Sequence, residues 1–221
     1  MKADFWHAMW ATGKVGFHQS QINDFLITHW PALNLKGHES VLVPLCGKSL
    51  DMLWLQQRGH NVLGVELSQQ ALQAFLTEAH MEAKPVQHNP FCGYESAGMT
   101  LLCGDFFKLR LEDCSDIRAV YDRAAIVALP PQMRQAYVLH LKKVLPTLPK
   151  SSKSSKGIGV QILMVTLEYD QSKMSGPPFS VTEPEVRDLF GAFATVNKLC
   201  EVPTSRKGLA MLEKAYLIQL H

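Results

Sequence analysis

Residues 40–48 read Ser-Val-Leu-Val-Pro-Leu-Cys-Gly-Lys, and residues 61–67 read Asn-Val-Leu-Gly-Val-Glu-Leu. Each begins as a short apolar run of the kind that forms a buried strand. Between the two runs, Leu50, Leu53 and Trp54 recur at the spacing of a helix. This strand–helix–strand order predicts a parallel sheet, and ligands of such sheets bind beyond the carboxyl ends of the strands.

The same alternation continues towards the C-terminus. Further strands are predicted within residues 99–107, 119–129 and 159–169, and helices after Ser68, after Pro130-Pro131 and after Thr182. The last two apolar runs, residues 197–202 and 214–220, are predicted to pair as an antiparallel hairpin. The sequence therefore predicts an α/β fold with three layers, in which a mostly parallel sheet ends in an antiparallel C-terminal strand.

Composition excludes several classes of protein. The chain has 221 residues, of which 47% are hydrophobic and 19% charged, so it is neither disordered nor collagenous. Its net charge of only +2 gives no support to a nucleic-acid partner or an anionic membrane. The longest apolar run, residues 162–167, falls far short of the ~20 residues that span a bilayer.

The N-terminus and the cysteines indicate where the protein acts. The first seven residues lack the charged and then apolar stretches of a secretory signal. The five cysteines form no Cys-x-x-Cys pair, which favours reduced thiols and makes a zinc site an unsupported reading. We therefore expect a cytoplasmic protein without a metal.

The turn after the first strand is the first place to look for a ligand. Residues 44–48, Pro-Leu-Cys-Gly-Lys, lack the Gly-x-Gly-x-x-Gly pattern that lets backbone approach a pyrophosphate. NAD and FAD are therefore disfavoured. A ligand without a phosphate, such as S-adenosylmethionine, needs only amides and carbonyls from this turn.

Glu66 ends the second strand and lies 21 residues after Leu45. At that spacing an acid accepts both hydroxyls of a nucleoside ribose. The alternative is an ordinary surface carboxylate beside the helix that follows Ser68. Its position at the end of a strand favours the ribose interpretation.

Two later strand ends also carry candidate residues. After the third strand, Asp105 is a candidate acceptor from an adenine amino group and Phe106 a candidate apolar surface for the ring; the alternative is a turn-capping acid and a core aromatic. After the fourth strand, Arg123 pairs either with the carboxylate of a bound amino acid or with a neighbouring acid.

Two other residue types were considered as ligand contacts. Trp6 and Trp10 are core residues or cover a ligand. The nine histidines show no metal spacing and are interpreted as structural or surface residues.

Five stretches, in order, resemble the thiopurine S-methyltransferase family across nearly the whole chain. They are Trp10-Ala-Thr-Gly-Lys-Val-Gly-Phe-His18, Pro44-Leu-Cys-Gly-Lys48, Arg58-Gly-His-x-Val-x-Gly-Val-Glu66, Asp122-Arg-Ala-Ala-Ile-Val-Ala128 and Gly176-Pro-Pro-Phe179. The resemblance implies a Rossmann-like class I methyltransferase fold in a single domain, residues 1–221. Residues 1–38 would form a helical cover over the cofactor, and residues 39–221 the sheet core.

The resemblance also implies site residues. Those expected to contact S-adenosyl-L-methionine are Trp10, Leu45, Glu66, Gly104, Asp105, Phe106 and Arg123; Phe17 and Phe179 are expected to line the acceptor pocket. Position 105 is not uniformly acidic in the family, so contact there through backbone alone stays open. The sequence does not separate two roles for Arg123, which are holding the cofactor and favouring an acceptor thiolate.

The implied activity is transfer of a methyl group to small aromatic or heterocyclic thiols such as thiopurines, by a monomer that binds no nucleic acid or membrane. The sequence leaves two alternatives open. One is a methyltransferase that detoxifies selenium or tellurium oxyanions, and the other is a non-catalytic S-adenosylmethionine sensor.

Overall fold

The computed structural model describes residues 3–13, 18–146, 159–206 and 208–221. Within these residues, nine strands form one sheet in the order β3-β4-β5-β2-β1-β6-β7-β9-β8. Their bounds are β1 (Ser40–Pro44), β2 (Asn61–Glu66), β3 (Lys84–His88), β4 (Phe91–Ser96), β5 (Met99–Cys103), β6 (Ile117–Arg123), β7 (Gln161–Glu168), β8 (Ala194–Arg206) and β9 (Leu209–Leu220). The five central strands are parallel, and β9 runs antiparallel to β7, which confirms the expected C-terminal strand.

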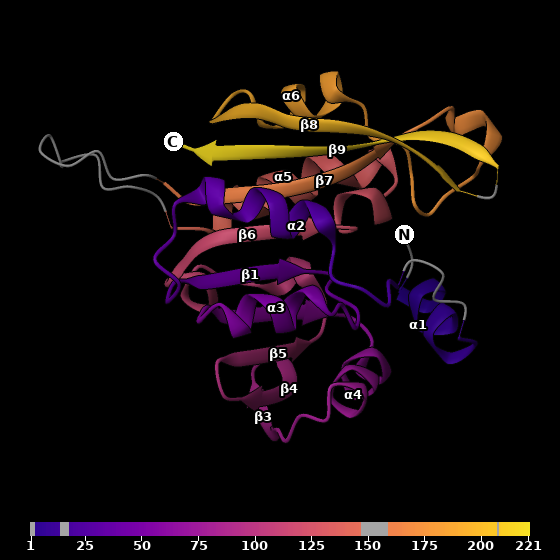
Figure 1. The fold of residues 1–221 in the computed structure, drawn as a ribbon. Coiled ribbons are helices and arrows are strands. Elements are labelled where there is room, and N and C mark those ends of the chain that lie inside the picture. Colours follow the sequence, from indigo (N-terminus) through magenta and orange to yellow (C-terminus); the bar gives the residue numbers. More distant parts are fainter. Residues whose placement is uncertain (1–2, 14–17, 147–158, 207) are drawn as a thin grey trace, which may run out of the picture.

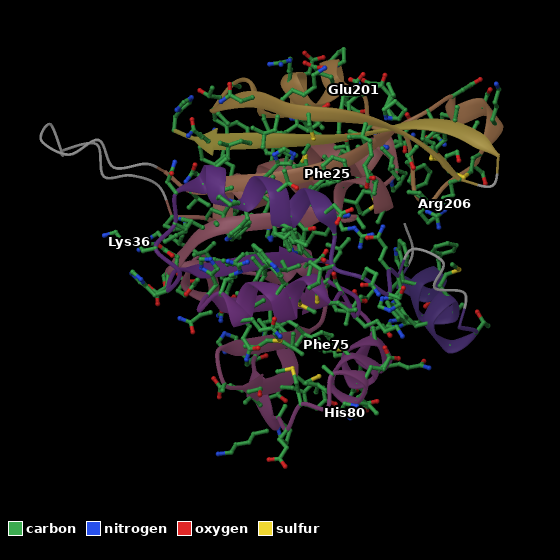
Figure 2. The ribbon with its side chains drawn as sticks, in the orientation of Figure 1. Phe25, Lys36, Phe75, His80, Glu201 and Arg206 are labelled. Carbon is green, nitrogen blue, oxygen red and sulfur yellow. The ribbon has the colours of Figure 1, made fainter. Side chains whose placement is uncertain are left out.

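Helices cover both faces of this sheet, so the predicted three layers are confirmed (Figure 1). The α-helices are α1 (Ala3–Ala11), α2 (Asp24–His29), α3 (Asp51–Gln57), α4 (Gln69–Glu78), α5 (Pro131–Val144) and α6 (Glu183–Phe190). One core cluster contains side chains of α2, α3 and α4, and a second contains side chains of α5 and α6. In Figure 2, Lys36 and Glu201 lie at the edge of the molecule, whereas Phe75 of α4 is inside and only 1% exposed.

The antiparallel edge next to β5 is the main feature that the sequence did not predict. β3 pairs with β4, and β4 with β5, both antiparallel. β3 reads Lys-Pro-Val-Gln-His and is mostly exposed, because it has a neighbouring strand on one side only. A short polar edge strand lacks the alternation of apolar residues by which strands are recognised.

Several predicted strands end earlier than expected. The third ends at Cys103, because the Asp105 side chain accepts the Phe107 backbone N–H at 3.0 Å and starts a 3-10 turn, η2 (Phe106–Lys108). The fourth ends at Arg123, because Asp122 accepts the N–H groups of Ala125 and Ile126 at 3.2 Å each. The C-terminal hairpin is longer than predicted at both ends.

The chain order places the switch point of the sheet between β1 and β6. From β1 the chain adds β2 and then β5 on one side, and later β6 and β7 on the other. Ligand sites of open α/β sheets lie at this point, beyond the carboxyl ends of the strands. Helix α1 lies at that end of the sheet, in the direction in which the β1 arrow points (Figure 1). None of the helices built from the described residues is long and apolar enough to cross a bilayer.

Candidate active site

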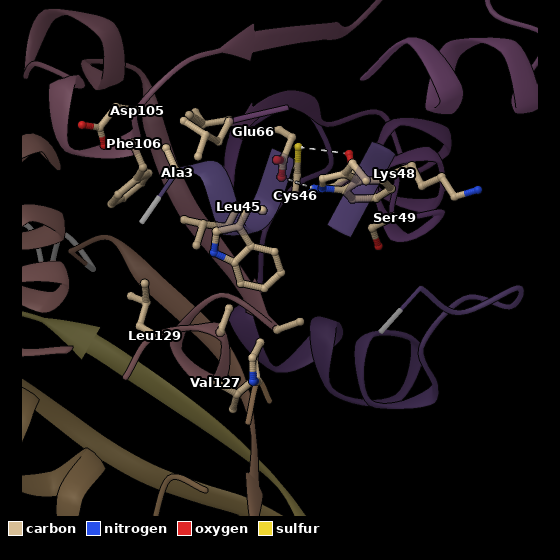
Figure 3. Close-up of a pocket in the computed structure, with 18 of the residues that line it drawn as sticks. Ala3, Leu45, Cys46, Lys48, Ser49, Glu66, Asp105, Phe106, Val127 and Leu129 are labelled. Carbon is tan, nitrogen blue, oxygen red and sulfur yellow. Dashed lines mark hydrogen bonds between the residues drawn. The ribbon is translucent and has the colours of Figure 1, made fainter. Parts of the chain in front are cut away.

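A cavity of about 350 Å³ opens at the carboxyl ends of β1, β2, β5 and β6 (Figure 3). Its lining comes from four strand ends, from α1 and from the segment before α6. The lining residues of main interest are Trp6, Trp10, His18, Leu45, Gly47, Glu66, Gly104, Asp105, Phe106, Phe107, Arg123, Val127, Leu129, Met133, Pro177 and Pro178. The topology thus brings seven of the nine predicted site residues to one cavity.

The turn after β1 has an unusual backbone. Leu45 has a φ of 49° and Gly47 a φ of 54°, both in the left-handed region. That conformation costs a residue with a Cβ about 1 kcal/mol or more, and such strain often marks functional sites. Ala124, with a φ of 75°, is a second strained residue of the same cavity wall.

Glu66 is tied to this turn and is only 7% exposed. One carboxylate oxygen accepts the Gly47 N–H and the other accepts the Ser68 N–H, each at 2.9 Å. Burial raises the pKa of Glu66, and these backbone hydrogen bonds partly oppose the rise. Each carboxylate oxygen has a second lone pair, so Glu66 keeps two acceptor positions next to the cavity.

The two tryptophans of α1 form one side of the cavity. Trp10 is 6% exposed, and Trp6 is half-buried. A Cβ at position 47 would lie only 3.1 Å from the Trp10 ring, so glycine allows the ring to sit against the turn after β1. Neither tryptophan is buried against the sheet alone, since both face the cavity.

At the end of β5, the turn-capping acid and the core aromatic are both observed, and both residues also line the cavity. Asp105 caps η2 and is exposed, as a turn-capping acid would be, yet it lines the cavity. Phe106 belongs to the core cluster, is 5% exposed and also contributes to the cavity wall. The Gly104 N–H donates to the Glu66 carbonyl oxygen at 2.9 Å, which holds the two strand ends together.

Arg123 and His18 are a positive group and a titratable group of the cavity lining. Arg123 is half-buried, and its guanidinium makes no hydrogen bond or ion pair with another of the described residues. Burial raises the pKa of Glu213, and the charge of Arg123 partly offsets that rise. Burial, followed by the charge of Lys48, lowers the pKa of His18. The sequence interpretation of every histidine as structural or surface missed the position of His18, although it ends the first stretch of the family resemblance.

The structure describes only one of the two residues that were predicted to line the acceptor pocket. Phe17 lies outside the described residues. Phe179 is half-buried and is not among the lining residues, but its neighbours Pro177 and Pro178 are. The Phe179 N–H donates to the carbonyl oxygen of Val127, which does line the cavity, at 2.7 Å. In Figure 3, Val127 and Leu129 lie at the opposite end of the cavity from Glu66 and Asp105.

These features fit S-adenosyl-L-methionine better than a dinucleotide. The turn after β1 offers no row of glycines for a pyrophosphate, whereas Glu66 offers oriented acceptors at the end of β2. Arg123 offers a cation without a partner in the described chain. The opposite end of the cavity is apolar, as a small aromatic ligand requires.

Comparisons with known proteins agree with a site for S-adenosyl-L-methionine. The family model for thiopurine S-methyltransferase matches residues 1–213. A thiopurine S-methyltransferase of Pseudomonas entomophila is 49% identical over 193 residues, which cover 87% of this chain and 84% of the relative. One of Marinobacter nauticus is 42% identical over 206 residues, covering 93% and 89%.

A solved structure shows the same fold at low sequence similarity. It is 1,6-didemethyltoxoflavin-N1-methyltransferase of Burkholderia thailandensis, determined with bound 1,6-didemethyltoxoflavin and S-adenosylhomocysteine. The TM-score is 0.62 at 15% identity, and the match covers 97% of this chain and 86% of the other.

The fold is therefore the Rossmann-like class I fold of S-adenosylmethionine-dependent methyltransferases. Within that class, the chain belongs to the thiopurine S-methyltransferase family. The methyl donor of this family is S-adenosyl-L-methionine.

Proposed function

We propose that this protein transfers a methyl group from S-adenosyl-L-methionine to the sulfur of small aromatic or heterocyclic thiols of the thiopurine type. The observation that carries this proposal is the two-ended cavity, with Glu66 and backbone amides at one end and apolar walls at the other. Such a division suits a polar nucleoside donor beside an apolar ring.

In this proposal Glu66 holds the ribose hydroxyls, and Trp10 covers the donor from the side of α1. Leu45 and Gly104 contribute backbone groups, while Asp105 and Phe106 face the adenine. Arg123 holds the carboxylate of the donor. Phe179, Phe17 and the walls near Val127 bind the acceptor ring.

When bound, S-adenosyl-L-methionine supplies a methyl group that its sulfonium already activates. The protein must orient the acceptor sulfur in line with that methyl group and keep water out. Proximity and orientation of this kind supply on the order of 7–11 kcal/mol. An aromatic thiol that ionises near neutral pH needs no strong general base, so catalysis here requires positioning rather than proton transfer.

The assay that tests the proposal measures transfer of labelled methyl groups to a panel of thiols, selenols, selenite and tellurite. We expect the highest kcat/KM for heterocyclic aromatic thiols. A higher kcat/KM for selenite or tellurite would mean that the acceptors are these oxyanions and not thiols. Tight donor binding without transfer to any member of the panel would indicate a sensor instead.

We further propose that residues 1–221 act as one domain, and that the protein works as a cytoplasmic monomer without nucleic acid or membrane partners. Sedimentation at several concentrations tests the oligomeric state directly. A mass that rises with concentration would contradict the monomer.

A further inference from the structure

Arg134 of α5 is a buried cation behind the cavity. Its side chain is only 1% exposed, and it is not one of the residues that line the cavity. An arginine stays protonated in proteins, so its burial is tolerated only when its N–H groups find acceptors. The acceptors of Arg134 come from three separate segments of the chain.

The guanidinium donates in three directions. Nε donates to the Leu129 carbonyl oxygen at 3.0 Å, and Nη2 donates to the Ser180 carbonyl oxygen at 3.0 Å. Nη1 donates to both carboxylate oxygens of Glu185, at 2.6 and 2.7 Å. Glu185 lies in the first turn of α6, whose N-cap is Thr182.

One carbonyl belongs to a residue that lines the apolar end of the cavity, and the other lies two residues after a lining residue, Pro178. Leu129 itself lines the cavity, and Ser180 follows Pro177-Pro178-Phe179, of which the two prolines line it. The two walls also meet at the hydrogen bond from the Phe179 N–H to the Val127 carbonyl oxygen. Arg134 therefore fixes, from behind, two wall segments that are about 50 residues apart in the sequence.

We propose that Arg134 is a positioning residue that sets the spacing of these two walls and thereby the fit of the acceptor ring. The inference rests on the proposed function, because it takes the apolar end as the acceptor end. Arg134 has no hydrogen bond to Glu66, Gly47 or Trp10 among those that the structure gives for its guanidinium. Its effect is therefore confined to the acceptor and spares the donor.

The informative variant is Arg134→Lys. Lysine keeps the positive charge beside Glu185, but a single ammonium does not reproduce the planar fork that reaches three acceptors. The matched control is Arg187→Lys on α6. Arg187 is exposed, and its guanidinium bonds Glu183 and the Val196 carbonyl oxygen, neither of which lines the cavity.

For Arg134→Lys we expect the KM of a heterocyclic thiol to rise tenfold or more, with a smaller change in kcat. The dissociation constant of S-adenosylhomocysteine, measured by calorimetry, should stay within twofold. Arg187→Lys should change neither. A Glu185→Gln variant, which keeps an acceptor for Nη1, should show a smaller rise in the acceptor KM than Arg134→Lys.

Hydrogen exchange read by mass spectrometry gives a readout that needs no acceptor. In Arg134→Lys, exchange should speed up at Ala128, Leu129 and residues 179–181, and stay unchanged at residues 45–49. Equal weakening of donor and acceptor binding, or unchanged KM and exchange in the folded variant, would overturn the proposal. If the wild-type protein methylates no thiol, the proposed function fails, and the exchange pattern alone still decides whether Arg134 holds the two walls.

Discussion

The backbone N–H of Gly47 donates to the carboxylate of Glu66 at 2.9 Å. This bond joins the turn after β1 to the end of β2, the strand that neighbours β1 on the side away from the switch point. The other oxygen of Glu66 accepts the Ser68 N–H, which fixes the carboxylate in two directions. An acid held in this way presents its remaining lone pairs to the cavity without having to be ordered by the ligand.

Glu66→Ala should weaken binding of S-adenosylhomocysteine by ~1–3 kcal/mol, because the ribose hydroxyls would lose their acceptors inside a closed site. The substitution also leaves the Gly47 and Ser68 N–H groups without their carboxylate, so the variant should unfold at a lower temperature. Calorimetry and thermal unfolding measure the two effects. Glu112→Ala, which removes an exposed carboxylate away from the cavity, serves as control. Unchanged affinity in folded Glu66→Ala would remove Glu66 from the donor site.

Deletion of residues 1–17 should abolish donor binding, because it removes Trp6 and Trp10 from the cavity wall. The sheet core should still fold, since the two core clusters contain no side chain of α1. Circular dichroism checks the fold, and calorimetry with S-adenosylhomocysteine checks binding. If the truncated chain bound as well as the full chain, both tryptophans would return to a purely structural role.

Arg123→Ala separates the two roles that remain open for this cation. If Arg123 mainly holds the donor carboxylate, as we expect, the KM of the donor rises while kcat changes little. If it stabilises the acceptor thiolate, kcat falls and its pH profile moves up, because the thiol ionises less readily. Arg123→Lys should restore stabilisation of the thiolate better than binding of the donor carboxylate, because the carboxylate is bound by the bidentate fork of an arginine. A normal donor KM with a strongly reduced kcat would show that the thiolate role dominates.

Asp122 links stability to pH. Burial raises the pKa of this acid from 3.8 to about 6 in the folded protein, although it accepts the Tyr137 hydroxyl at 2.8 Å. A raised acid pKa means that the folded state binds the proton more tightly, so this stabilisation is present below pH 3.8 and is lost as the pH rises through about 6.

The amide that Asp122→Asn introduces does not titrate, so the stability of wild type relative to this variant should fall by about 1 to 1.5 kcal/mol between pH 5 and pH 8. Urea unfolding of both proteins at these two pH values measures the difference. A difference that does not depend on pH would mean that Asp122 titrates at its ordinary value when folded.

The sequence predicted the sheet core because its strands are apolar runs and its helices have regular stripes. The position of Glu66 at the cavity was predictable from its spacing to Leu45, because both residues lie at the carboxyl ends of neighbouring parallel strands. β3 was not, because a polar strand at the edge of a sheet has no apolar periodicity. The bonds of Arg134 were equally hidden, since a buried arginine in a helix looks like a surface residue until Leu129, Ser180 and Glu185 are brought around it. The positive φ of Leu45 and of Ala124 was not predictable either, because neither residue type favours the left-handed region.

The position of Asp105 was predictable at two levels. Its side chain caps η2, as a local pattern predicts, and it lines the cavity, as its place after a strand of the parallel sheet predicts. The position of His18 was not predicted. No metal spacing surrounds it in the sequence, and its place beside the cavity is visible only in the structure.

Transfer of an isotope-labelled methyl group to a heterocyclic thiol, with NMR identification of the methylated atom, tests the central claim most directly. We predict that the labelled methyl appears on sulfur in the wild-type reaction, and that Glu66→Ala slows its appearance at donor concentrations below saturation while Glu112→Ala does not. Label on nitrogen or oxygen, or no transfer to any thiol from a protein that binds S-adenosylhomocysteine, would contradict the account.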